Sequence, residues 1–137
     1  MPSANSRIRL IQSALSAREQ AVAPYSEFKV GAALLTARGK IITGANVESA
    51  SYGLTCCAER VALFKALTQG DRNFTAIAVA ARVEGGAMPC GACRQLLAEY
   101  APNALVWIAD SNLPEHAQEF SVKELLPGAF RFSKTSV

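Results

Sequence analysis

The chain has 137 residues, of which 50% are hydrophobic and 18% are charged, and its formal net charge is +3. We therefore expect one domain spanning residues 1–137, because this length buries a substantial core. No apolar run approaches the roughly 18 residues of a membrane span, and no basic stripe suits a nucleic-acid backbone. Membrane and polynucleotide partners are thus disfavoured, whereas the small share of charge favours a homo-oligomer that covers surplus apolar surface.

The first ten residues carry neither the apolar segment nor the small-residue cleavage site of a secretory signal. We therefore expect a cytoplasmic protein. In that reducing compartment, clustered cysteines are more often metal ligands or catalytic groups than disulfide partners. The four cysteines of the chain are interpreted accordingly.

The N-terminal third predicts a helix followed by a hairpin. Residues 5–22 predict the helix, because Ile8, Ile11 and Leu15 fall on one face, and Pro24 ends it. Apolar runs at residues 28–35 and 41–45 then predict two strands, which are joined by the Arg38-Gly39-Lys40 turn.

The rest of the chain alternates helices and strands. A second helix is predicted over residues 57–69, with Thr55 as its candidate N-cap and Gly70 as its stop. Pro89 suits the first turn of a third helix. The remaining elements are predicted at residues 75–81 (strand), 89–100 (helix), 105–109 (strand) and 122–126 (helix). This order predicts an α/β sandwich with a mixed, partly parallel sheet.

The most informative motif has two parts, Cys57-Ala58-Glu59 and Pro89-Cys90-Gly91-Ala92-Cys93. Three thiolate ligands leave a tetrahedral Zn²⁺ ion with one open position, where water can bind. Glu59 is two residues from Cys57, and we expect its carboxylate to transfer the protons of that water. Cys90 and Cys93 share a helix face, and the helix N-termini favour thiolate over thiol. The pattern is the all-cysteine form of the zinc deaminase signature.

A closed structural zinc site is the main alternative, and it would need a fourth ligand. Cys56 is adjacent to Cys57, and neighbouring helical side chains point about 100° apart, so we expect Cys56 to be a small buried hydrophobic residue. The only histidine, His116, lies in a polar segment and is expected on the ordinary surface. Glu59 favours the catalytic interpretation, because a closed zinc site gives a carboxylate no task.

Three thiolates and one Zn²⁺ ion have a summed charge of −1. Such a site polarises its bound water less than a zinc ion held by neutral histidines does. A positive group nearby would compensate. Arg60 directly follows Glu59, and we expect its guanidinium to hydrogen-bond the thiolates and draw off charge.

Several segments together resemble the small homotetrameric cytidine deaminases. They lie at residues 23–26, 28–34, 44–48, 57–60, 89–95 and 124–130. The resemblance implies a three-layer α/β/α sandwich with a five-stranded mixed sheet, in which residues 118–121 are the candidate fifth strand. It also implies one Zn²⁺ per chain and a tetramer whose active sites lie between subunits.

The resemblance also implies residue roles. Cys57, Cys90 and Cys93 would bind zinc, and Glu59 would shuttle protons. Asn46 and Glu48, two apart after a strand, would bind the ribose hydroxyls, since alternate side chains project the same way. The remaining expected substrate contacts are Phe28 against the nucleoside, Ala58, and Ala50, Tyr52 and Phe130 reaching a neighbouring subunit's site. Without the resemblance, Phe28 and Phe130 are equally interpretable as core aromatics, Asn46 as a turn residue and Glu48 as a solvated charge.

The expected activity is the hydrolytic deamination of cytidine and deoxycytidine to uridine and deoxyuridine, with release of ammonia, in pyrimidine salvage. One alternative substrate is a blasticidin-type nucleoside antibiotic. A polynucleotide-editing deaminase would need basic and aromatic residues along a groove, whereas the single tryptophan, Trp107, lies in an apolar strand. The non-enzymatic alternative is a structural zinc module.

Overall fold

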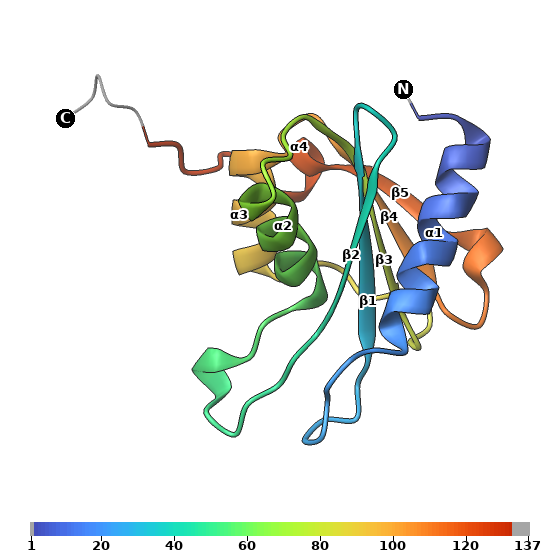
Figure 1. Ribbon diagram of the computed structural model, residues 1–137, viewed down its shortest axis with the longest axis vertical. Helices are drawn as coiled ribbons and strands as arrows, with labels where there is room; N and C mark the ends of the chain where they lie inside the picture. The colour runs from blue at the N-terminus through green and yellow to red at the C-terminus, as the bar shows by residue number, and fades with distance from the viewer. Residues whose placement is uncertain (1, 133–137) are drawn as a thin grey trace.

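The computed structural model describes residues 2–132. A five-stranded sheet in the order β2-β1-β3-β4-β5 forms the middle layer. Helix α1 (Ala4–Arg18) covers one face, while α2 (Ala58–Thr68), α3 (Gly91–Tyr100) and the short α4 (Val122–Leu125) cover the other (Figure 1). The predicted three-layer α/β/α sandwich is confirmed.

The sheet is mixed. Its strands are β1 (Val30–Thr36), β2 (Ile41–Ala45), β3 (Phe74–Ala81), β4 (Leu105–Asp110) and β5 (Gln118–Ser121). Only β3 and β4, which α3 connects, pair in parallel, and the other neighbours are antiparallel. The candidate fifth strand at residues 118–121 is therefore present, as an edge strand.

Alternating side chains divide the core between the two faces of the sheet. Leu34, Ile77 and Val79 pack toward α2 and α3, whereas Ala78 and Trp107 pack toward α1. Trp107 is 2% exposed, as expected of a core residue. Gly44 lets α2 approach β2 closely, because a Cβ there would lie 2.5 Å from the backbone nitrogen of Ala62.

Helix α1 ends at Arg18, four residues before the predicted end at 22. The Gln20 and Ala21 amides bond the carbonyls of Ala17 and Arg18 in a closing turn. Val22 then forms a bridge with Val47, and this long-range pairing overrides the local pattern.

The starts of α2 and α3 also differ from the prediction. Cys57, and not Thr55, is the N-cap of α2. Cys90 is the N-cap of α3, so Pro89 lies just before the helix and does not open it. The other boundaries move by one or two residues; strand β1, for example, begins at Val30 because Phe28 is held outside the ladder. Within residues 2–132, no helix combines the length and apolar character needed to cross a lipid bilayer.

Candidate metal centre and substrate cavity

Three thiols meet where the N-termini of α2 and α3 converge. The Sγ atoms of Cys57 and Cys90 are 3.8 Å apart, and those of Cys90 and Cys93 are 3.5 Å apart. All three sulfur atoms lie within 4.8 Å of one another. Cys57 and Cys90 are the N-caps of α2 and α3, and Cys93 lies in the first turn of α3. The cluster therefore lies at the starts of two helices, where free N–H groups are available.

The donor set fits zinc. A tetrahedral ion with metal–sulfur bonds of about 2.3 Å separates its sulfur ligands by about 3.8 Å, which is close to the observed spacing. The hydrogen bond from the Cys93 thiol, helped by Arg60, lowers the pKa of Cys57 to about 5. At least one thiolate is therefore available near neutral pH before any metal binds.

Arg60 contacts the cluster as the sequence predicts. Its Nη2 atom donates to the Sγ atom of Cys57 at 3.4 Å and to the carbonyl oxygen of Thr55 at 3.3 Å. Its Nε atom is buried without a hydrogen-bond partner. The guanidinium therefore places a positive charge in direct contact with one thiol of the cluster.

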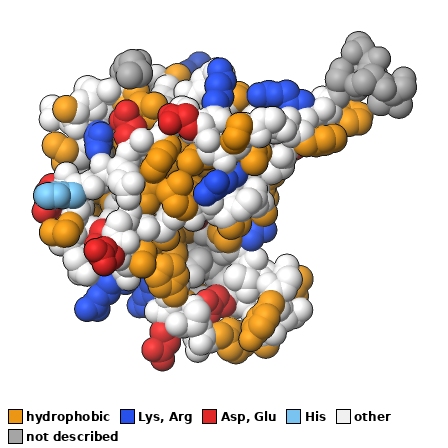
Figure 2. Space-filling view, turned by 180° about the vertical axis from the view of Figure 1, so that it is seen from behind, with side chains coloured by type: hydrophobic (Ala, Val, Ile, Leu, Met, Phe, Trp, Pro, Cys, Tyr) orange, Lys and Arg blue, Asp and Glu red, His pale blue; other side chains and the backbone are white. Residues whose placement is uncertain are grey.

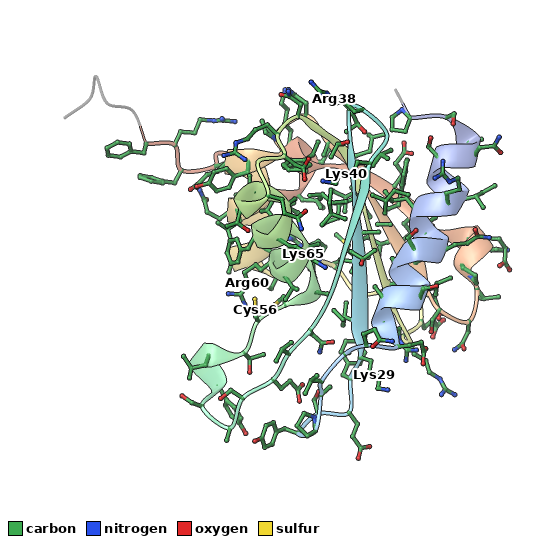
Figure 3. The ribbon with its side chains drawn as sticks, in the orientation of Figure 1. Lys29, Arg38, Lys40, Cys56, Arg60 and Lys65 are labelled. Carbon is green, nitrogen blue, oxygen red and sulfur yellow. The ribbon has the colours of Figure 1, made fainter. Side chains whose placement is uncertain are left out.

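Cys56 and His116 lie outside the triad. Cys56 is next to Arg60 at the start of α2 (Figure 3) and is half-buried, not fully buried as predicted. Burial raises the pKa of its thiol, which keeps it protonated. The His116 side chain is 73% exposed, which confirms the predicted surface position.

Glu59, in the first turn of α2, is only 5% exposed. Burial, together with the nearby Cys57 thiolate, raises the pKa of its carboxyl group to about 7. A group with this pKa exchanges protons readily in both directions near neutral pH.

A cavity of about 210 Å³ opens beside the triad. Glu59, Cys57 and Cys90 lie on its wall together with the predicted contacts Phe28, Asn46 and Ala58. The sequence analysis missed five further lining residues: Val30, Thr55, Val79, Ala87 and Met88. Thr55, Ala87 and Met88 had a usable signal, since they lie within three residues of the thiol motifs, and Val30 lies in the family-like segment 28–34.

Asn46 is 8% exposed and ties the cavity rim to β1. Its Nδ2 atom donates to the carbonyl oxygen of Phe28 at 2.8 Å, and its Oδ1 atom accepts from the amide of Val30 at 2.9 Å. An amide side chain has four hydrogen-bonding positions, so one donor and one acceptor remain for a ligand.

Glu48 organises the turn beside the rim. Its carboxylate accepts hydrogen bonds from the Ser26 hydroxyl and from the amides of Tyr25 and Ser26, the amide distances being 3.0 and 3.1 Å. The Ser26 hydroxyl is the main reason why the pKa of Glu48 is lowered. Glu48 also borders an adjoining hollow, lined by Tyr25, Ser26, Ser49, Tyr52 and Thr55.

The residues predicted to reach a neighbouring subunit lie at the periphery. Tyr52 is 83% exposed in the projecting 3₁₀ helix η1 (Tyr52–Leu54), and Ala50 is exposed just before it. Phe130 is 69% exposed on the segment that leaves the body of the molecule after α4 (Figure 1). The structure thus brings Asn46 and Phe28 to the same cavity as Glu59, Cys57 and Cys90, but it places Glu48 at the adjoining hollow. Ala50, Tyr52 and Phe130 lie outside the cavity of their own chain.

A three-layer sandwich that holds a thiol triad beside a buried glutamate is typical of the zinc-dependent deaminases. The family profile described as the cytidine and deoxycytidylate deaminase zinc-binding region matches residues 4–109. The chain therefore belongs to this deaminase family, and the triad of Cys57, Cys90 and Cys93 is its zinc-binding site.

Relatives and solved structures agree with this assignment. The chain is 55% identical to a cytidine deaminase of Halalkalibacterium halodurans over 125 residues, which cover 90% of this chain and 93% of the relative. The crystal structure of cytidine deaminase from Burkholderia pseudomallei superposes with a TM-score of 0.84 at 48% identity, covering 90% and 98% of the two chains. A blasticidin-S deaminase of Bacillus cereus is 30% identical over 106 residues, which are 72% of this chain and 74% of that one.

Proposed function

We propose that the protein hydrolyses cytidine and deoxycytidine to uridine and deoxyuridine, with release of ammonia. The observation that carries the proposal is one cavity whose wall holds Glu59, Cys57 and Cys90 beside the substrate-binding candidates Asn46 and Phe28. A nucleoside fits the chemistry of this cavity, which is mostly apolar with a few convergent polar groups.

Cys57, Cys90 and Cys93 hold the zinc ion. When bound, zinc supplies the Lewis acidity that makes water acidic enough to act as a nucleophile near neutral pH. Arg60, which donates to the Cys57 sulfur, offsets the negative charge of three thiolates and so preserves that acidity.

Glu59 moves the protons. Its carboxylate accepts a proton from the attacking water and delivers one to N3 of the pyrimidine, which makes C4 electrophilic. After hydroxide has added at C4, Glu59 takes the remaining proton of that hydroxyl group and delivers it to the departing amine, so that cytidine and water become uridine and ammonia. One carboxyl group serves as base and then as acid because burial holds its pKa at about 7.

The sugar is held at the rim. The free donor and acceptor of Asn46 and the carboxylate of Glu48 bind the ribose hydroxyls, and Phe28, which is 40% exposed at the cavity, packs against the nucleoside. Ala58, fully buried at the base of the cavity, closes it beneath the pyrimidine.

A homotetramer completes the site. Tyr52 and Leu54 in η1, and Phe130 and Phe132 after α4, are large exposed apolar side chains that lie close together in sequence within each segment. Apolar side chains that gather on a surface are typical of protein–protein contacts. With Ala50, Tyr52 and Phe130 reach the cavity of a neighbouring copy, where Phe130 covers the pyrimidine.

Two alternatives are less well supported. Identity to the cytidine deaminases reaches 55%, against 30% for the blasticidin-S deaminase. On the face drawn in Figure 2, lysine and arginine side chains are scattered among apolar and acidic ones, which does not suit a polynucleotide backbone. We further propose a cytoplasmic location, because the three thiols of the triad need a reducing environment to remain metal ligands.

An ultraviolet assay with equal concentrations of cytidine, deoxycytidine, blasticidin S and a cytosine-containing oligonucleotide tests the proposal. We expect turnover of the first two only. Turnover of blasticidin S alone would reassign the substrate, and a zinc-loaded protein inert toward all four would favour a structural zinc module.

A further inference from the structure

The loop at residues 82–90 connects β3 to α3 and supplies two different parts of the site. Ala87 and Met88 form part of the cavity wall, and Cys90 is a metal ligand. The loop contains no α-helix or strand. Its position must therefore come from contacts with the elements around it.

The first half of the loop is held by the edge strand β5. The Nε2 atom of Gln118 donates to the carbonyl oxygen of Gly85 at 2.8 Å. Gln118 is itself fixed, because it pairs with Ile108 in the β4–β5 ladder. The loop lies directly on this ladder: a Cβ at Gly86 would be 2.5 Å from the Cγ2 atom of Ile108.

The second half of the loop is held separately by Arg94 in α3. Its Nε atom donates to the carbonyl oxygen of Pro89 at 2.8 Å, and its Nη1 atom donates to the carbonyl oxygen of Leu125 at 3.1 Å. The metal-binding turn is thereby fixed to α3 and to the end of α4.

We propose that Gln118 is a positioning residue that sets the Ala87–Met88 wall of the substrate cavity, independently of the metal-binding turn that Arg94 holds. The proposal rests on the proposed function for its kinetic consequence. Gln118 contacts neither the cavity nor the thiols; it acts through Gly85, which lies two residues before the wall.

The two anchors separate substrate binding from chemistry. Glu59 and Cys57 belong to α2 and do not depend on the loop, and Cys90 is held through Pro89 by Arg94. Loss of the Gln118 bond therefore loosens the wall, which the packing of Gly86 on Ile108 still restrains, while the proton shuttle and the metal ligands stay in place. A looser wall weakens substrate binding more than it slows turnover.

The test is Gln118→Glu in the full-length, zinc-loaded protein. This substitution keeps the shape of the side chain but replaces the amide donor by a carboxylate, which faces the Gly85 carbonyl. Because one hydrogen bond is lost, we expect KM for cytidine to rise about two- to tenfold. We expect kcat to stay within about twofold, with unchanged zinc content and Tm, because Gln118 is exposed.

Two control variants isolate the hydrogen bond. Gln20→Glu makes the same change of charge at an exposed glutamine beyond α1 and should leave KM unchanged. Gln118→Lys restores a donor and should recover most of the wild-type KM. A Lys variant as impaired as the Glu variant would show that the donor is not responsible.

The outcomes distinguish the inference from the proposed function. If the wild type deaminates cytidine and Gln118→Glu leaves KM unchanged, or lowers kcat and zinc content together, the inference is wrong and the function stands. If the wild type is inert, the function is wrong, and amide hydrogen exchange decides the inference. Exchange at Ala87 and Met88 should accelerate in Gln118→Glu, and unchanged exchange would overturn the inference.

Discussion

The metal end and the sugar end of the cavity are built from different kinds of structure. At the metal end, three sulfur atoms converge from two helix starts, and Glu59 is 5% exposed. At the sugar end, Phe28 is 40% exposed, and Glu48 lies on a rim of turns and loops. The carboxyl group that moves protons is thus buried within one chain, whereas Phe28 and Glu48 lie on a partly exposed rim, which we propose a neighbouring subunit completes.

The difference predicts two kinds of mutational response. Groups at the metal end act as a unit, so the loss of one disables the rest. Groups at the rim each add a separate increment of binding, so their loss should change KM in graded steps.

The largest effect should come from the metal ligands. Cys90→Ala removes one of three thiolates, and we expect loss of bound zinc and of deamination together. Elemental analysis of the purified variant measures the metal. Cys56→Ala is the matched control, since Cys56 is adjacent to the triad but outside it, and it should retain zinc. A full zinc complement in Cys90→Ala would contradict the ligand assignment.

A smaller effect at the same end should come from Arg60, which contacts the Cys57 sulfur at 3.4 Å. We expect Arg60→Ala to release zinc to a chelator about 10- to 100-fold faster than the wild type. Arg60→Lys, which keeps the charge but not the planar fork, should fall between the two. If Arg60→Ala releases zinc and deaminates cytidine at wild-type rates, Arg60 does not stabilise the metal site.

At the rim, Glu48→Gln replaces a carboxylate by a neutral amide of the same shape. A neutral amide accepts hydrogen bonds more weakly than a carboxylate, so we expect KM for cytidine to rise by up to about tenfold with kcat nearly unchanged. Steady-state kinetics measures both. A fall in kcat at constant KM would place Glu48 with the reacting groups and break the comparison.

The pH dependence of KM provides a further test of the role of Glu48. The Ser26 hydroxyl holds the pKa of Glu48 below its usual 4.5. The contribution of the Glu48 carboxylate to substrate binding is therefore fully present above pH 4.5 and is lost only as the pH falls through the lowered pKa. We expect no titration of KM by this group between about pH 5 and 8. If KM of the wild type changes with pH within that window, and Glu48→Gln abolishes the change, the account is contradicted.

The smallest kinetic effect should come from the loop behind the cavity. Gly86→Ala places a Cβ 2.5 Å from Ile108 at a φ of +82°, and overpacking of this kind costs about 1–3 kcal/mol of stability. We expect a lower Tm and a modest rise in KM. Gly39→Ala is the control: its φ is +88° but no atom lies within 4 Å, so Tm should fall without a change in KM.

The metal end was largely predictable from sequence, because its residue types form a recognisable two-part zinc motif. Cys57 and Cys90 are 33 positions apart, so the motif and not local spacing predicts that they meet, whereas Glu59 and Arg60 follow from their positions beside Cys57. The exact helix starts were not predicted. Cys57 is the N-cap of α2, where Thr55 was expected, and Cys90 is the N-cap of α3, where Pro89 was expected to open the helix.

The walls of the cavity were not predictable in the same way. The bond from Gln118 to Gly85 joins residues 33 positions apart and depends on the β4–β5 register. The early end of α1 likewise results from the pairing of Val22 with Val47. Local periodicity carries no signal for such contacts, which only the assembled sheet creates.

The central claim is that Glu59 moves the protons while the thiols hold the metal. Glu59→Gln, assayed for zinc content and cytidine turnover on the same preparation, tests it directly. The account predicts one zinc per chain and a loss of kcat of about 10²- to 10⁴-fold, which is typical of a missing general acid–base. Wild-type turnover at full zinc content would contradict it.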